Sequence, residues 1–344
     1  MGKTKLILLE GVPGSGKSTL AQFITHAFAR EGIVCQWWYE EVKGHPLYVF
    51  HDLTSLQDTL NALSNGGYRA VIRDALKRWR KFAELVQTSE DVVILDGCLF
   101  GYLTWTLFPM DVSPDEIRQY LMQVEEIIKP LHPKLIYLYQ RDLSAAMEKI
   151  CARRGEDARK RFIDQATQSA YGKRRGFKDF GGMVAYWEDY CAFIDAVSSR
   201  FLISHLALEN SAGDWSAYEQ RALEFLSFPA TTWPDIASNA FKRFVGLYTY
   251  KEDGSEHICE VKLEGTHCVV DGMPEVWQHT RLRPLSSAEF VVESLPIRVS
   301  FQEDEHGNVI QMKTEGPDML FGSVSRLFTR VLDNPIVARL SPRH

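Results

Sequence analysis

The chain has 344 residues, of which 45% are hydrophobic and 24% are charged, so it carries enough apolar material for two ordinary domains. A formal net charge of −6 at pH 7 gives no general attraction to nucleic acid or anionic lipid, and no apolar run is long enough to span a bilayer. No signal peptide is recognisable and the six cysteines form no CxxC pair, so we expect reduced thiols in a cytoplasmic protein. From the charge and the short apolar runs, we expect that it binds neither a membrane nor nucleic acid.

The first half of the chain alternates short apolar runs with longer helical patterns. Strands are predicted over 5–10, 33–41, 91–97, 133–140 and 200–208, and helices over 17–32, 52–64, 68–87, 113–131, 142–155 and 214–228. The start of the helix over 113–131 is clear, because Ser113 is a good N-cap and Pro114 is favoured at the first helical position. Uniformly apolar strands separated by helices predict an α/β fold over residues 1–228, a doubly wound parallel sheet with helices on both faces.

The second half of the chain changes character. Residues 229–240 contain two prolines and are predicted to be a linker. Beyond them the apolar residues alternate with polar ones, and glycine-containing turns recur at 271–273 and 304–308. This pattern predicts a small antiparallel β-sheet or β-barrel domain over residues 241–344.

A glycine-rich loop follows the first predicted strand and opens the first predicted helix. Its spacing, Gly11-x-x-x-x-Gly16-Lys17-Ser18, is the P-loop pattern, in which inward-pointing N–H groups and a helix N-terminus bind phosphates. We expect Lys17 to reach the β- and γ-phosphates of ATP and Ser18 to hold Mg²⁺. The residues predicted to bind the nucleotide are Gly11, Pro13, Gly14, Ser15, Gly16, Lys17, Ser18 and Thr19.

Acidic residues stand at the ends of two further predicted strands. Asp96 ends the strand over 91–97, where an acid can face the phosphate loop and organise Mg²⁺ or its water. Glu40 and Glu41 follow the second strand, and either carboxylate could take a proton from an attacking hydroxyl. The neighbouring Trp37, Trp38 and Tyr39 are more often core residues than substrate contacts, and His45 is more often structural.

A basic run follows the fourth predicted strand and its helix. Arg153, Arg154 and Arg159 are candidates for stabilising the charge that spreads over a phosphoryl group in transfer. Three alternatives stay open. The run could be a solvated helix face, the second basic stretch at 171–180 could take this role or contact the acceptor, and the arginines and lysines of the helix over 68–87 could contact the acceptor.

The first 225 or so residues resemble the nucleoside and nucleotide kinases of the P-loop class, especially thymidylate kinase and the deoxynucleoside kinases. The order of phosphate loop, acid after strand two, Asp96 after strand three and arginine-rich segment carries the resemblance. It implies that Lys17 and Ser18 bind phosphate and magnesium, and that an arginine-rich lid closes over the site. The chain departs from these families at Gly97, where they usually carry an arginine directly after the acid, and it lacks their Glu-Pro after strand two. The C-terminal part resembles small lipocalin-like barrels.

These observations predict an ATP- and Mg²⁺-dependent phosphotransferase. Its acceptor would be a hydroxyl or phosphate of a small molecule such as a nucleoside, nucleotide, antibiotic or sugar-like metabolite. The alternative is a regulatory P-loop NTPase that signals through its C-terminal domain, and a polynucleotide kinase is a third interpretation. The chain carries no Asn-Lys-x-Asp guanine motif, which argues against a GTPase. We expect the C-terminal domain to bind a ligand, dock on the N-terminal domain or form a homodimer.

Overall fold

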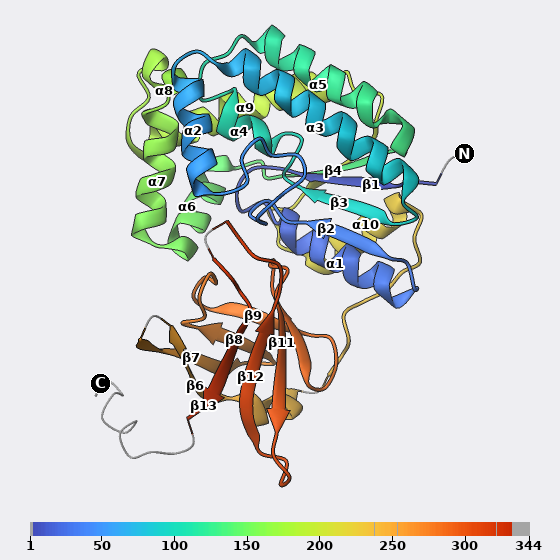
Figure 1. Cartoon of the computed structure of the whole chain (residues 1–344), viewed down its shortest axis with the longest axis vertical. Helices are drawn as coiled ribbons and strands as arrows, with labels where there is room; N and C mark the ends of the chain where they lie inside the picture. Colours follow the sequence, from blue (N-terminus) through green and yellow to red (C-terminus); the bar gives the residue numbers. More distant parts are fainter. Residues whose placement is uncertain (1–2, 237, 253, 321, 332–344) are drawn as a thin grey trace. The chain divides into compact units, whose positions relative to one another are not determined.

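The computed structural model describes residues 3–236, 238–252, 254–320 and 322–331 (Figure 1). The chain divides into two compact units, Met1–Thr232 and Trp233–His344, and the predicted linker 229–240 spans this division. Residues 1–2 of the predicted first domain, 237 of the predicted linker, and 253, 321 and 332–344 of the predicted β domain lie outside the described residues. No helix in the described part of the chain combines the length and the apolarity needed to cross a membrane.

The first unit is built on a five-stranded sheet in the order β2-β3-β1-β4-β5. The strands are β1 (Leu6–Glu10), β2 (Cys35–Trp38), β3 (Val92–Asp96), β4 (Lys134–Tyr139) and β5 (Ser204–Glu209), and every neighbouring pair is parallel. β1 and β3 are buried along their whole length, which explains the run of apolar residues before Glu10 in one and before Asp96 in the other. The predicted α/β fold with a P-loop is confirmed.

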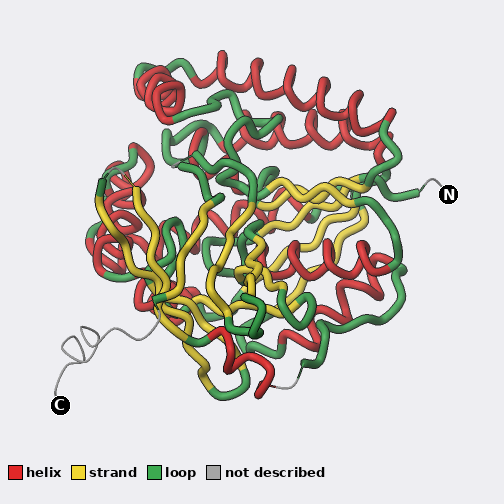
Figure 2. Tube along the Cα trace, turned by 60° about the horizontal axis from the view of Figure 1, so that its bottom comes forward, coloured by secondary structure: helices red, strands yellow, loops and turns green. Residues whose placement is uncertain are grey.

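Helices cover both faces of this sheet, with α3 and α5 on one side and α1 and α10 on the other (Figure 1). Figure 2 shows the same layers, with strands in yellow and helices in red. The helices are α1 (Lys17–Arg30), α2 (Leu53–Ser64), α3 (Tyr68–Thr88), α4 (Gly101–Thr106), α5 (Pro114–Ile128), η1 (Lys129–Leu131), α6 (Leu143–Arg154), α7 (Glu156–Thr167), α8 (Ala170–Arg175), α9 (Asp179–Ser198) and α10 (Trp215–Leu226). As expected, Ser113 caps α5 and Pro114 is its first residue.

Several features differ from the sequence predictions. α4 was not predicted, and the strand predicted over 200–208 begins at Ser204. The segment between β4 and β5 contains four helices, α6 to α9, whereas only the first was predicted. Gly155, with φ +85°, ends α6 and starts α7. The second strand, predicted over 33–41, is shortened to four residues, Cys35–Trp38, which pair with β3 at the edge of the sheet.

The second unit is a closed antiparallel barrel, in the order β10-β11-β12-β13-β6-β7-β8-β9. A 3₁₀ segment, η2 (Ser238–Phe244), precedes it. The strands are β6 (Gly246–Glu252), β7 (Ser255–Glu264), β8 (His267–Asp271), β9 (Thr280–Pro284), β10 (Glu289–Val292), β11 (Arg298–Glu303), β12 (Val309–Glu315) and β13 (Arg326–Arg330). The predicted antiparallel β domain is confirmed, and its closure leaves no unpaired edge among the described strands.

Aromatic side chains fill the interior of the barrel. Phe244 stacks on Phe301 with ring centroids 4.3 Å apart and meets Phe290 edge-on at 5.4 Å. Tyr248 donates a hydrogen bond to the Phe244 carbonyl at 2.7 Å. A cavity of about 340 Å³ in this unit is lined instead by the segment before β6, by the β7–β8 turn and by β9. Its lining residues are Trp233, Pro234, Asp235, Ile236, Phe241, Thr266, His267, Arg281, Leu282, Arg283 and Pro284.

Candidate active site

The phosphate loop joins β1 to α1 in the geometry that its spacing predicts. Gly14 and Gly16 have φ of +76° and +90°, values that glycine adopts without strain. The Lys17 ammonium is buried and donates to the Val12 carbonyl at 3.3 Å, so it lies folded over the loop. In the described first turn of α1, no acidic side chain and no side-chain cap competes for the helix N-terminus. These features fit a loop that could hold a phosphate group.

Side chains from distant elements hold the loop in place. A Cβ on Gly14 would lie 2.4 Å from Ile150 of α6, and a Cβ on Gly16 would lie 2.1 Å from the ring of Trp215 at the start of α10. The side chain of Asn210, just after β5, donates to the Ser15 carbonyl. Sequence reasoning missed Ile150, Asn210 and Trp215, although the position of Asn210 at the carboxyl end of a strand was a signal.

Asp96 lies at the end of β3, beside the phosphate loop. Its carboxylate is fully buried, and neither oxygen accepts a hydrogen bond of good geometry from the described residues. Burial and, after it, the charge of Glu40 raise the pKa of Asp96 to about 7, against the lowering effects of Lys17 and the Ser18 hydroxyl. Lys17, Ser18 and Glu40 are therefore all close enough to Asp96 to change its pKa.

The two glutamates after β2 lie in different surroundings. A Cβ on Gly97 would lie 2.9 Å from Glu40 Oε2 and 3.1 Å from Lys17 Cε, so Glu40 and Lys17 close over this glycine. Both glutamates lie near Tyr39, whose pKa is raised first by burial and then by the charges of Glu41 and Glu40. Glu40 is thus the glutamate beside the phosphate loop.

The predicted arginines also separate. Arg154 is half-buried, and the charges of Glu40 and Glu41 oppose the lowering of its pKa by burial. Arg159 instead forms an ion pair with Glu148, with Nη1 2.7 Å from Oε2. Arg153 is exposed on the last turn of α6. Arg154 therefore lies near Glu40 and Glu41, whereas Arg159 lies on the next helix, α7, in an ion pair with Glu148 of α6.

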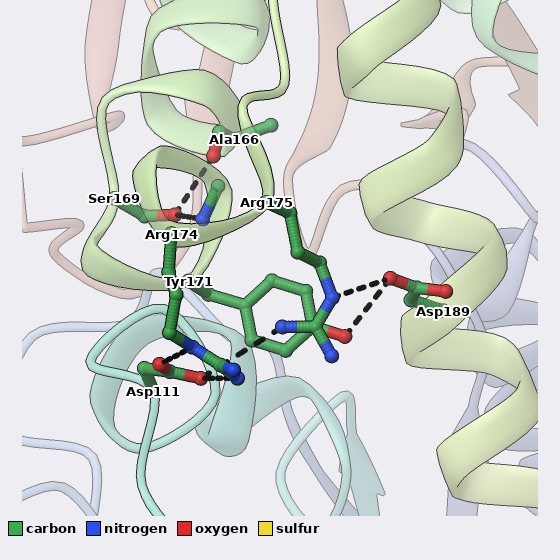
Figure 3. A network of polar contacts seen from close by, with 8 residues as sticks. Asp111, Ala166, Ser169, Tyr171, Arg174, Arg175 and Asp189 are labelled. Carbon is green, nitrogen blue, oxygen red and sulfur yellow. Dashed lines mark hydrogen bonds and ion pairs between the residues drawn. The ribbon is translucent and has the colours of Figure 1, made fainter.

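The second basic stretch is held by acidic partners (Figure 3). Arg174 Nη2 donates to Asp111 Oδ1 at 2.7 Å. Arg175 lies over the ring of Tyr171, 3.6 Å from its centroid, and its Nε lies 3.1 Å from Asp189 Oδ2. The Tyr171 hydroxyl donates to the same Asp189 oxygen at 3.0 Å. These arginines join α8 to α9 and to the loop before α5.

The aromatic residues near β2 form a packed block. His45 is 2% exposed, is stacked on Tyr48 at 4.2 Å and meets the edge of Trp38 at 5.5 Å. Its Nδ1 accepts from the Leu47 N–H at 3.3 Å, and its Nε2 lies 3.3 Å from Cys98 Sγ. Burial lowers the pKa of His45 to about 3, so the imidazole is neutral at pH 7 and acts as a structural group.

Sequence reasoning also missed Glu10, the last residue of β1. Its buried carboxylate accepts the N–H groups of Leu99, Phe100 and Gly101 at 2.7, 3.1 and 3.2 Å. Burial raises the pKa of Glu10 to about 7 against these hydrogen bonds and the charge of Lys17. The signal available in the sequence was a carboxylate at the end of an apolar strand, directly before Gly11.

The described residues contain no group of three or more His, Cys, Asp or Glu side chains arranged to hold a metal ion by themselves. Ser18 and Asp96 do supply two oxygen donors beside the phosphate loop, and the Asp96 oxygens are buried without a good hydrogen-bond donor in the described residues. Mg²⁺ typically takes one or two protein oxygens and completes its shell with phosphates and water. The residues therefore fit Mg²⁺ bound together with a nucleotide.

No known protein family and no curated protein matches the sequence. Among solved structures, the chain is similar to thymidylate kinase from Ehrlichia chaffeensis, with 10% identity and a TM-score of 0.36 over 66% of this chain and 100% of that one. It is similar to a sugar kinase from a Janibacter species, with 14% identity and a TM-score of 0.34 over 67% and 99% of the two chains. A Bacillus subtilis protein in complex with phosphorylated GDP gives 12% and 0.34 over 64% and 95%. At these values the matches assign no activity to this chain.

Proposed function

We propose that this protein is a phosphotransferase that moves the γ-phosphate of ATP to a hydroxyl of a small molecule. The observation that carries the proposal is the meeting of three groups at one point. Lys17 comes from the phosphate loop, Asp96 ends the neighbouring strand, and the Glu40 carboxylate approaches both across Gly97. A phosphate-binding cation, a metal-binding carboxylate and a second carboxylate that can accept a proton are the parts that phosphoryl transfer to an alcohol needs.

Each group has a separate role in the proposed reaction. The N–H groups of the phosphate loop and Lys17 hold the β- and γ-phosphates. Ser18 and Asp96 would hold Mg²⁺, which when bound neutralises phosphate charge. Glu40 accepts the proton of the acceptor hydroxyl as its oxygen bonds to the γ-phosphorus. The bond from that phosphorus to the β–γ bridging oxygen breaks, and ADP leaves. Arg154 stabilises the charge on the moving phosphoryl group.

The charges at the site favour a hydroxyl acceptor over a phosphate. Glu40, Glu41 and Asp96 lie at or just after the carboxyl ends of β2 and β3, and the charges of Glu40 and Glu41 also act on Arg154. A second phosphate brought to these carboxylates would be repelled, because like charges at close range raise each other's energy. Nucleosides, antibiotics and sugar-like metabolites are the acceptor classes that we propose, in a cytoplasmic enzyme without a nucleic-acid or membrane partner. A homodimer remains a separate proposal.

The test is a coupled ADP-release assay with Mg²⁺-ATP and matched acceptor pairs. Each pair consists of an alcohol and its monophosphate, drawn from nucleosides, sugars and hydroxyl-bearing antibiotics. An alcohol that stimulates ADP release and gains the mass of one phosphate supports the proposal, provided that Lys17→Ala abolishes the stimulation. Stimulation by monophosphates alone would contradict the hydroxyl acceptor. Steady ATP hydrolysis that no acceptor changes would favour the regulatory NTPase.

A further inference from the structure

The end of β1 is tied to the segment that follows β3 by one side chain. Glu10 is fully buried, and its two carboxylate oxygens accept three consecutive N–H groups, those of Leu99, Phe100 and Gly101. An ionised carboxylate only accepts hydrogen bonds, so it suits a position faced by three donors. Burying a carboxylate is unfavourable unless such partners compensate it. Glu10 and the segment 97–101 therefore form one polar unit inside an apolar core.

The same segment is held from its other side. The Tyr190 hydroxyl of α9 donates to the Phe100 carbonyl at 2.5 Å. The Gly97 N–H donates to the Leu9 carbonyl at 2.8 Å, next to Glu10 in the chain. Both backbone polar groups of Phe100 are thus bonded to side chains, one from the sheet and one from the helix.

The position of this segment matters because its first residues contact the site. It starts at Gly97, over which Glu40 and Lys17 close, and it follows directly on Asp96. Glu10 itself precedes Gly11, the first glycine of the phosphate loop. One residue therefore connects the loop proposed to hold the nucleotide with the segment that supports the proposed base.

We propose that Glu10 is a positioning residue, which sets the distance between the phosphate loop and the segment Gly97–Gly101 and so aligns Glu40 with the γ-phosphate. This inference rests on the proposed phosphotransferase activity. Glu10 acts through Asp96 and Gly97. Its loss is expected to lower kcat and to leave the binding of Mg²⁺-ATP nearly unchanged, because a misplacement of about 1 Å can slow a reaction roughly 100-fold.

The test compares two isosteric variants of buried carboxylates. In Glu10→Gln the amide keeps an acceptor for Leu99 but turns an N–H₂ donor toward the N–H groups of the next residues. Glu125→Gln is the matched control. The Glu125 carboxylate is also buried and accepts the backbone N–H groups of Leu202 and Ile203, the second at 3.0 Å, but these groups lie before β5 and away from the site. Both variants are unfolded in denaturant to compare their stability.

We expect kcat of Glu10→Gln to fall roughly 10- to 100-fold with KM for ATP within about threefold of the wild type. Glu125→Gln should keep the wild-type kcat at the same folded fraction. Hydrogen exchange should accelerate at residues 99–101 in the first variant and at 202–203 in the second. If Glu10→Gln does not fold, Tyr190→Phe takes its place, because it removes one hydrogen bond and keeps the ring; we expect a smaller drop in the same direction.

The positioning role would be overturned if Glu10→Gln and the control Glu125→Gln had equal kcat values. The same holds for Tyr190→Phe where it replaces Glu10→Gln. An equal rise of KM for ATP and fall of kcat/KM, with kcat unchanged, would overturn it as well, because it would show a defect in nucleotide binding. A wild-type protein that transfers phosphate to no acceptor overturns the proposed function. In that case no γ-phosphate is transferred for Glu40 to be aligned with, so the positioning role of Glu10 is overturned as well.

Discussion

The carboxylate of Glu40 occupies the space that a side chain at position 97 would need, since a Cβ on Gly97 would lie 2.9 Å from Glu40 Oε2. Gly97 also has φ +67°, a conformation that other residues rarely adopt. An arginine at this position, directly after the acid, would require both the backbone and Glu40 to move. The departure from the kinase pattern noted in the sequence is therefore built into the geometry of the site.

We expect Gly97→Ala to lower turnover roughly 100-fold, because the new methyl group displaces the Glu40 carboxylate from Lys17. Gly44→Ala is the control. Gly44 has φ +74°, and a Cβ there would meet no atom within 4 Å. Both substitutions should lower the free energy of unfolding by about 1–2 kcal/mol through the left-handed backbone. Turnover and denaturant unfolding of both variants check this, and equal turnover in the two would show that Glu40 tolerates displacement.

The two glutamates after β2 should respond differently to loss of charge. Glu40→Gln removes the carboxylate that faces Lys17 across Gly97 and whose charge acts on Asp96, so we expect turnover to fall by about 10²- to 10⁴-fold with nucleotide affinity kept. Glu41→Gln should lower turnover by less than about tenfold. Steady-state kinetics and titration with Mg²⁺-ADP measure the two effects. A larger loss in Glu41→Gln would assign the base to Glu41 and contradict the placement of Glu40.

Arg154 and Arg159 make a second matched pair. Arg154→Gln removes the cation that feels Glu40 and Glu41, and we expect turnover to fall roughly 100-fold. Arg159→Gln breaks a partly exposed ion pair with Glu148, which is worth about 1 kcal/mol or less, and turnover should stay near that of the wild type. Kinetics of both variants at saturating ATP distinguish these outcomes. If Arg159→Gln is the slower variant, the segment rearranges when substrates bind.

Because His45 is buried as a neutral group, the free energy of unfolding should fall on mild acidification. The unfolded chain binds a proton at this histidine near pH 6.5, whereas burial lowers the pKa of folded His45 to about 3. Between these values the unfolded state holds more protons, so stability is lost as pH falls. From pH 7.5 to pH 5, the wild type should lose about 2 kcal/mol more than His45→Gln. Denaturant unfolding at both pH values measures the difference, and parallel losses would mean that His45 is protonated in the folded protein.

Much of the fold could be predicted because it follows from local patterns. The phosphate-loop spacing needs only eight consecutive residues, Gly11 to Ser18, and the carboxyl ends of parallel strands bring Glu40 and Asp96 to one edge of the sheet. α9 was not predicted, although its buried residues Met183, Trp187, Tyr190, Ile194 and Val197 recur at helical spacing.

Contacts between distant residues could not be predicted in the same way. Trp215 packs on Gly16 from the far end of the domain, and no periodicity links the two positions. The separation of Glu40 from Glu41 depends on which side chain turns toward Gly97, which a strand-end rule does not decide. Glu10 was overlooked because a carboxylate inside an apolar strand end has meaning only when the three N–H donors opposite it are known.

In the strand order β2-β3-β1-β4-β5, the strands that carry the candidate site differ in how many neighbours they are hydrogen-bonded to. β1, which carries the phosphate loop, is bonded to a strand on each side, whereas β2, which leads to Glu40, is bonded on one side within the described sheet. Edge strands open more readily than central ones. Gentle warming would then free the base before it loosens the phosphate loop, and the protein would pass through a form that still retains nucleotide but no longer turns it over.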